Sequence, residues 1–282
     1  MNRGCGNRAR GRTRGRESLD DGLGNVACLV ARAKLREATE MPRADSHSKV
    51  RAAAAAVLLV VLCPGVRAAP AVALPDVDAI VSYQTRQVLA SGVERQERWQ
   101  ERLVRRGDRV WTERVLPRAA RAAHGHESPA EHAAHKHFDF ESAARLVSQG
   151  AGGAVELQYV DTRRRVVVNV PKAEFGAVGF DGRWDAAASI VPPAVVAGMP
   201  LLRGTPRVAG SGNVWHVEKD GEWSHRVLWS VDRRIALRVE SARLDGSVRR
   251  VVTVEPAKPG SAGAPWADTA AYAQKEYDDF MD

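Results

Sequence analysis

Two Asp-Gly dipeptides, at positions 220–221 and 245–246, constrain the fold more than any other feature of the sequence. Each lies between two runs in which apolar and polar residues alternate, and Asp-Gly is a preferred sequence for the two-residue turn of a β-hairpin. Four consecutive strands joined by such tight turns indicate an antiparallel sheet. We expect these strands over residues 214–219, 222–230, 235–244 and 247–255.

The two turns also predict which residues face each other across each hairpin. If each loop consists of the dipeptide alone, Val239 lies opposite Val252, which pairs two apolar side chains. In the first hairpin the same rule places His216 opposite His225. Directly opposed residues have Cβ atoms about 4.5–5.5 Å apart, close enough for two imidazoles to share a metal ion. The alternative is a pair of neutral, partly exposed histidines on a sheet face.

The segment from 80 to 116 predicts a three-strand meander. Residues 80–90 and 109–116 are rich in β-forming side chains, and residues 93–104 lie between a Ser-Gly turn and an Arg-Gly-Asp turn. The many charged residues in this segment predict an outer sheet face that contacts solvent.

The middle of the chain predicts one more hairpin and several short helices. The hairpin comprises residues 155–160 and 164–170, on either side of an Asp-Thr-Arg turn. Asp139 is a suitable N-cap for a helix over 140–149, which would stop at a glycine. The irregular segment 172–203, interrupted by two prolines, predicts short helices that cover one side of the sheet.

The carboxyl terminus predicts a helix after a linker. Residues 256–265 are rich in proline, glycine and serine, and the segment 266–282 follows. Its apolar residues recur at helical spacing, which predicts an amphipathic helix over 268–280 packed on the sheet. The residues at this spacing are Trp266, Ala270, Ala273, Tyr277 and Phe280. The sequence thus predicts a mainly antiparallel β protein with a few short helices, as a single domain over 69–255 followed by this C-terminal helix.

Residues 41–68 have the three regions of a secretory signal peptide in the correct order. Basic residues come first, an apolar run at 52–62 follows, and small residues at 66–68 provide a cleavage site. The apolar run is shorter than the roughly 20 helical residues that span a bilayer. We therefore expect export to the periplasm, with no transmembrane segment in the mature chain. Since a signal stands at the front of a chain, residues 1–40 are predicted to be a non-native or disordered extension upstream of a start at Met41.

The charge balance argues against nucleic acid as a partner of the mature chain. The formal net charge is +8, but residues 1–68 contain 13 of the 42 Lys and Arg residues and 6 of the 34 Asp and Glu residues. The later residues therefore hold 29 basic and 28 acidic side chains, without the positive surplus that a polyanion requires. Cys5, Cys28 and Cys63 also precede residue 69, so the mature domain offers no thiolate ligand.

An insertion at 118–137 is unusually rich in histidine. A capping box at 128–131 predicts a short helix that places two of its histidines on one face. Imidazole is a common ligand of Zn²⁺ and Cu²⁺, so the insertion is a candidate site for either metal, together with His216 and His225. The alternative is a polar surface loop that titrates near about pH 6.5. The insertion holds five of the eight histidines of the chain: His124, His126, His132, His135 and His137.

The closing hairpins carry an arrangement that is similar to a known family. A Val-Ala-Gly run at 208–210 precedes them, and the strand between the turns contains Arg-Val-Leu-Trp at 226–229. With the hairpin at 157–170 and the meander, this order resembles the periplasmic lipoprotein-carrier superfamily, which includes LolA, LolB and the N-terminal domain of RseB. The resemblance implies a half-barrel whose helices line a hydrophobic cavity for acyl chains or a partner's segment. The histidine-rich insertion and the C-terminal helix depart from that family.

We therefore expect a non-enzymatic, exported binding or accessory protein whose histidine-rich loop binds Zn²⁺ or Cu²⁺. The alternative, implied by the resemblance, is a carrier or sensor of a hydrophobic ligand such as a lipoprotein acyl chain, with an envelope protein or lipoprotein as partner. A metal hydrolase would need a general base that no residue provides, and no serine or cysteine nucleophile motif follows residue 68. The carrier hypothesis predicts one continuous pocket lined by Trp99, Trp111, Phe175, Trp215 and Trp229.

Overall fold

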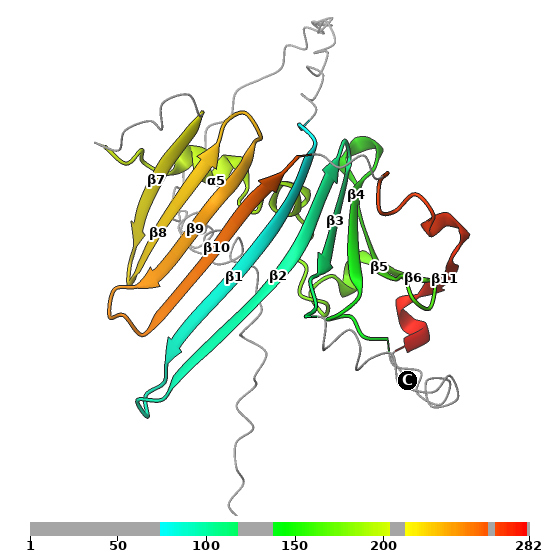
Figure 1. Cartoon of the computed structure of the whole chain (residues 1–282), viewed down its shortest axis with the longest axis horizontal. Coiled ribbons are helices and arrows are strands. Elements are labelled where there is room, and N and C mark those ends of the chain that lie inside the picture. The colour runs from blue at the N-terminus through cyan, green and yellow to red at the C-terminus, as the bar shows by residue number, and fades with distance from the viewer. Residues whose placement is uncertain (1–73, 118–137, 204–211, 259–262, 281–282) are drawn as a thin grey trace, which may run out of the picture.

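The computed structural model describes residues 74–117, 138–203, 212–258 and 263–280 (Figure 1). These residues form one 11-stranded sheet with the order β11-β6-β5-β4-β3-β2-β1-β10-β9-β8-β7. Neighbouring strands are antiparallel except for β11 and β6. The strands are β1 (Val77–Val88), β2 (Glu94–Arg106), β3 (Arg109–Arg114), β4 (Ala144–Gln149), β5 (Val155–Asp161), β6 (Val166–Val170), β7 (Asn213–Asp220), β8 (Trp223–Ser230), β9 (Ile235–Arg243), β10 (Val248–Ala257) and β11 (Ala273–Glu276).

The predicted meander, the middle hairpin and the four closing strands are confirmed as β1–β3, β5–β6 and β7–β10. Strand β10 pairs with β1 along almost its whole length, from Asp78 opposite Ala257 to Gln87 opposite Val248. This long-range pairing joins the closing hairpins to the meander. The predicted signal peptide, the extension before it and the histidine-rich insertion lie outside the described residues.

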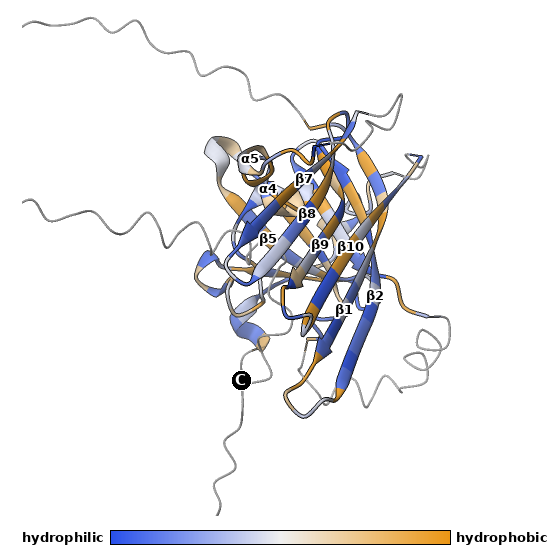
Figure 2. Cartoon of the chain, turned by 90° about the vertical axis from the view of Figure 1, so that its left-hand side faces the viewer, coloured by the Kyte–Doolittle hydropathy of each residue, from blue (hydrophilic) through white to orange (hydrophobic). Residues whose placement is uncertain are grey.

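The sheet is curled without closing, and the helices lie on its concave face (Figure 2). Helix α4 (Trp184–Ser189) is followed by α5 (Pro193–Gly198), which has a proline at its first turn, a position where the missing N–H costs nothing. These helices confirm the predicted cover on one side of the sheet. The remaining helices are single 3₁₀ turns: η3 (Ala151–Gly153), η4 (Lys172–Glu174), η5 (Thr269–Ala271) and η6 (Tyr277–Phe280).

Two apolar clusters fill the concave face. The first packs Ala188, Val196 and Met199 from the helical segment against β1, β2, β8, β9 and β10. The second packs Phe175 and Phe180 against β4, β5 and β6. Trp184 contacts both clusters, so α4 joins them into one layer. We call the sheet residues of the first cluster the helix-covered end: Val77, Ala79, Val81, Leu103, Val110, Val227, Ile235, Ala236, Val239, Val252 and Val254.

A buried arginine fixes the connections around the helix-covered end. The guanidinium of Arg105, on β2, is inaccessible to solvent and donates hydrogen bonds to the carbonyl oxygens of Pro75, Ala188, Arg233 and Arg234. Burial lowers the pKa of Arg105 to about 10. One side chain thus holds the start of β1, the end of α4 and the β8–β9 turn together, because buried carbonyl groups require hydrogen-bond donors.

The predicted helix over 140–149 is wrong. Asp139 does cap a turn, since its Oδ1 accepts hydrogen bonds from the backbone N–H groups of Glu141 and Ser142. The turn then ends, and Ala144–Gln149 form β4 between β3 and β5. Leu146 and Val147 are both buried, in clusters on opposite faces of the sheet. A strand satisfies both side chains because successive residues alternate between faces.

The predicted C-terminal helix is also wrong. Trp266 packs on the convex face in a third cluster with β2–β6, whereas Tyr277 packs in the second cluster on the concave face. Between them, Ala273–Glu276 form β11, which pairs in parallel with the edge of β6. A single helix would place these two aromatic residues on one side, but the chain passes around the sheet edge and supplies β6 with hydrogen-bond partners. The first two residues of the predicted linker at 256–265 belong to β10, which extends to Ala257.

The register of the second closing hairpin is confirmed, with Val239 opposite Val252. The register of the first is wrong by two residues, because Asp220 pairs with Trp223 and the turn consists of Gly221 and Glu222. Gly221 has a φ of 53°, so the turn places its glycine at the first central position, where a positive φ is required.

Candidate functional site

A row of polar side chains crosses six neighbouring strands beside the helix-covered end. The preceding row on the same face is mostly apolar: His216, Val227, Val239, Val252, Tyr83 and Trp99. Both rows line the concave face, because residues two apart on a strand point to the same side. The sheet therefore changes from apolar to polar within one step. The polar row consists of Glu218, His225, Ser241, Arg250, Thr85 and Glu97, and together with Tyr83 and Trp99 it forms what we call the polar end.

Two aromatic rings stack at the boundary between the two ends. The ring centroids of Tyr83 and Trp99 are 5.0 Å apart with an interplanar angle of 12°. The guanidinium of Arg114 lies 5.2 Å from the Trp99 ring centroid, within cation–π range. Both rings are half-buried, and Tyr83 also contacts the first apolar cluster. The two rings therefore extend the apolar surface of the first cluster up to the guanidinium of Arg114.

Charged and phenolic groups surround this stack. The hydroxyl of Tyr83 donates a hydrogen bond of 3.1 Å to the Glu101 carboxylate. Burial raises the pKa of Tyr83 well above its usual range, and the Glu101 charge reinforces that shift while Arg145 opposes it. Burial likewise raises the pKa of Tyr159, which faces Arg145 across β4 and β5. Both phenols are therefore neutral hydrogen-bonding groups at physiological pH.

Arg145 brings a positive charge to the junction of the two concave clusters. Its Nε atom is buried and has no hydrogen-bond partner among the residues that the structure describes. Its positive charge opposes the rise in the pKa of both Tyr83 and Tyr159. The polar end can therefore hold an apolar group against Tyr83 and Trp99 and an acceptor near Arg114 and Arg145.

The polar row is partly desolvated. Burial lowers the pKa of His225, although Glu218 and Asp220 oppose the shift, and the imidazole Nδ1 is 2.9 Å from the Ser241 hydroxyl oxygen. The Trp223 ring stacks on His225 with centroids 6.1 Å apart. Burial also lowers the pKa of Arg250, with Glu97 opposing it.

The two sheet histidines do not form the predicted opposed pair. His216 lies opposite Val227, and His225 lies opposite Glu218, because of the register shift. The Nδ1 of His216 is 3.1 Å from the Met199 carbonyl oxygen, so each ring contacts a different protein group. Within the described ranges, no three His, Cys, Asp or Glu side chains are grouped as metal ligands would be. The other five candidate ligands, His124, His126, His132, His135 and His137, lie outside those ranges.

The five aromatic residues predicted to line one pocket are distributed over several parts of the molecule. Trp111 is buried in the convex cluster, Phe175 in the second concave cluster, and Trp229 against the first. Trp215, on the edge strand β7, lies under the guanidinium of Arg226 at 4.9 Å. Only Trp99 belongs to the polar end. The prediction of one continuous aromatic pocket is therefore wrong.

Sequence reasoning missed Tyr83, Arg114 and Arg145 as members of the site. Their common signal is the period of two, which places Tyr83 and Arg145 on the same face as buried apolar residues of their own strands.

In the part of the chain that the structure describes, no helix is long and apolar enough to cross a membrane.

The described residues form a curled, unclosed antiparallel sheet whose concave face carries two apolar clusters and the polar end. No protein-family model and no curated relative matches the chain. Among similar solved structures, PNGF-II is 11% identical with a TM-score of 0.32 over 73% of this chain and 33% of that chain, so this chain spans about a third of PNGF-II. A DUF1329 family protein from Desulfovibrio piger is 10% identical, with a TM-score of 0.33 over 71% of this chain and 92% of that chain.

A LolA superfamily protein from Nitrosomonas europaea is 9% identical, with a TM-score of 0.25 over 66% of this chain and 89% of that chain. A protein of the superfamily that the closing hairpins resemble is thus among the similar solved structures. The likeness is one of fold.

Proposed function

We propose that this chain is an exported, non-enzymatic carrier or accessory protein that binds an amphipathic ligand at the polar end of its half-barrel. The ligand has an apolar chain, such as a lipoprotein acyl chain, and a polar group that accepts hydrogen bonds. Its partner is an envelope protein or a lipoprotein, and its compartment is the periplasm. This is the carrier alternative raised by the sequence, with the stacked rings of the polar end in place of the single aromatic pocket expected there.

The stack of Tyr83 and Trp99 beneath Arg114 is the observation that carries this proposal. Half-buried aromatic rings beside a core extend an apolar surface, and binding sites for small molecules combine such surfaces with a few placed polar groups. Arg145 adds a second positive charge close to Tyr83, which favours a ligand that carries a carboxylate or ester oxygen. No nucleophile or metal-activated water is required for binding of this kind.

Fluorescence titration with a dansyl-labelled fatty acid tests the proposal. The wild-type protein should bind the probe with saturation, and Trp99→Ala should weaken binding about tenfold, equivalent to about 1.4 kcal/mol. Trp215→Ala is the matched control, because Trp215 also lies under an arginine but on the edge strand β7. Equal loss in the two variants, or no saturable binding by the wild type, would sink the proposal.

A second function, binding of Zn²⁺ or Cu²⁺ by the insertion, is proposed on its density of histidine, with five such residues between 124 and 137. Calorimetric titration with each metal should show micromolar or tighter binding that disappears when all five are changed to alanine. His216→Ala is the control that should leave binding intact, since its ring contacts a backbone carbonyl. Weak binding by both proteins would eliminate this second function.

A further inference from the structure

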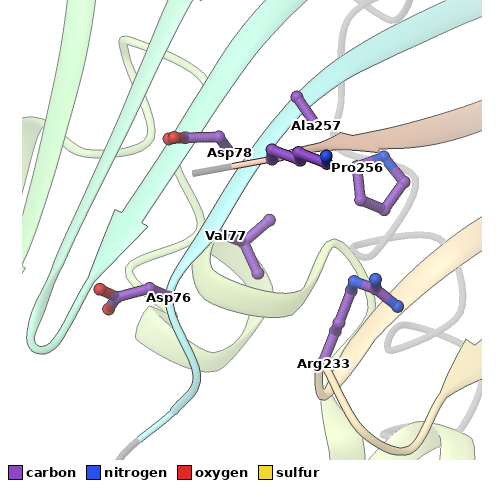
Figure 3. Close-up of a pocket in the computed structure, with 7 residues that line it drawn as sticks. Asp76, Val77, Asp78, Arg233, Pro256 and Ala257 are labelled. Carbon is purple, nitrogen blue, oxygen red and sulfur yellow. The ribbon is translucent and has the colours of Figure 1, made fainter. Parts of the chain in front are cut away.

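A pocket of about 340 Å³ lies where β1 begins and β10 ends, away from the polar end (Figure 3). Along β1, Val77 in the pocket and Thr85 in the polar row are eight residues apart, roughly 26 Å at about 3.3 Å per residue. A ligand in this pocket therefore occupies a different site from the proposed amphipathic ligand. The pocket is lined by Asp76, Val77, Asp78, Arg233, Pro256, Ala257 and Lys258.

The two aspartates of the pocket are already paired. Both carboxylate oxygens of Asp78 accept hydrogen bonds from Arg106, at 2.9 and 2.8 Å. The Asp76 carboxylate lies 3.6 Å from the same guanidinium. Figure 3 shows both carboxylates pointing to the side away from Arg233. Their negative charge is therefore directed at Arg106 and is partly neutralised there.

The two cations of the pocket have no such partners. Arg233 and Lys258 are exposed, and neither side chain makes an ion pair or hydrogen bond with the described residues. In Figure 3 the Arg233 side chain extends toward Val77 and Pro256. The pocket therefore combines a guanidinium and an ammonium group, both without a partner among the described residues, with the apolar surface of Val77, Pro256 and Ala257.

The walls of the pocket are held in place by Arg105. That side chain donates to the carbonyl oxygen of Pro75, which precedes Asp76, and to those of Arg233 and Arg234 on the opposite wall. A site whose backbone is fixed before the ligand arrives loses less entropy on binding. The hydrogen bonds involve backbone oxygens only, so the Arg233 side chain remains available to a ligand.

From these contacts we infer that this pocket binds a carboxylate that carries a short apolar group. Guanidinium groups bind carboxylates in a planar, two-pronged geometry, and the ammonium group adds a second point of charge. A volume of about 340 Å³ is at the lower limit of roughly 300–1,000 Å³ for small-molecule sites, which suits a ligand of this size. Such a carboxylate can come from a short fatty acid or from the last residue of a peptide.

Amide chemical-shift titration of the full chain by NMR tests this inference. The probes are hexanoate, N-acetylvaline, acetate and 1-hexanol. We expect hexanoate or N-acetylvaline to shift the backbone amides of Val77 and Ala257, with a dissociation constant below about 1 mM. The tighter of the two identifies the source of the carboxylate, and acetate and hexanol should bind at least tenfold more weakly because each lacks one half of the recognised group.

The double variant Arg233→Gln/Lys258→Gln should weaken binding by tenfold or more. It should fold normally, because the carbonyl oxygens that Arg105 contacts are retained. Arg249→Gln, which changes an exposed arginine near the start of β10 and far from the pocket at its end, is the matched control and should bind as the wild type does. Unchanged binding in the double variant, equal binding of hexanol and hexanoate, or no shift at Val77 and Ala257 would overturn the inference. None of these outcomes depends on whether the polar end binds an amphipathic ligand.

Discussion

The two ends of the concave face are built on the same strands but are stabilised differently. At the helix-covered end, Val81, Val239 and Val252 on three of these strands are almost inaccessible to solvent beneath residues of the helical segment. At the polar end, Arg250, two residues from Val252 on β10, and Thr85, four residues from Val81 on β1, are half-buried and charged or polar. How deeply a residue of these strands is buried therefore depends on whether the helical segment covers it.

The helix-covered end therefore mainly stabilises the fold, whereas the polar end is the proposed binding site. The helix-covered end is packed beneath residues of the helical segment, and its packing provides the hydrophobic stabilisation of the fold. The polar end retains Tyr83 and Trp99, with Arg114 and Arg145 beside them, and these side chains contribute less to the core. Substitutions at the two ends should therefore have opposite profiles, with large losses of stability at one and losses of binding at the other.

Removal of the Arg105 side-chain donors is expected to produce the largest effect. Arg105→Met keeps the volume but leaves one buried and three partly buried carbonyl oxygens without their donor, so we expect the free energy of unfolding to fall by about 3–5 kcal/mol. Chemical denaturation measures this change. Arg250→Met at the polar end is the control, and its cost should be at most about 1 kcal/mol because that arginine is half-buried and has no such set of acceptors. Equal costs would show that the two ends do not differ in this way.

A cavity at the helix-covered end should produce the next largest effect. Ile235 is inaccessible to solvent in the first cluster, so Ile235→Ala should cost about 3 kcal/mol. Trp99→Ala removes a larger side chain at the polar end, yet it should cost only about 1 kcal/mol, because the ring is half-buried and loses mainly its stack and its cation–π contact. Thermal and urea unfolding of both variants give the comparison. A greater cost for the tryptophan variant would contradict the assignment of Trp99 to binding.

The strands were predictable where local signals define them. The Asp-Gly turn at 245–246 and the alternating residues around it predicted the Val239–Val252 register, which the structure confirms. The turn at Gly221 was ambiguous, because a glycine can occupy either central position and each choice shifts the register by two residues. Such a shift keeps every side chain on its face, so the hydrophobic pattern could not distinguish the alternatives.

The elements that were not predictable depend on distant partners. Residues 144–149 form a strand because β3 and β5 flank them, and residues 273–276 form one because the edge of β6 is free to pair. The apolar residues at helical spacing in the C-terminal segment include Trp266 and Tyr277, which pack on opposite faces of the sheet. The site was missed for a similar reason, since Tyr83, Arg114 and Arg145 come together only across strands β1 to β4.

The smallest effect, the pH dependence of stability, should arise from His225 at the margin of the polar end. Its pKa in the folded protein lies below the value of 6.5 for an unperturbed histidine, because burial disfavours the imidazolium more than Glu218 and Asp220 favour it. Between these two pKa values the unfolded chain binds more protons than the folded chain does. Stability contributed by the neutral ring is therefore complete above about pH 6.5 and decreases as the pH falls toward the folded pKa, by at most about 1.4 kcal/mol per pH unit.

The variant His225→Asn should flatten this part of the profile, because asparagine can still accept or donate a hydrogen bond with Ser241 and does not titrate. The carboxylates with depressed pKa values, Glu94 at about 2 and Asp245, act at lower pH and do not overlap this range. Urea denaturation between about pH 5 and pH 8 measures the slope. If the wild type and His225→Asn have the same slope, the ring of His225 is not desolvated in the folded protein. The polar row would then be exposed to solvent.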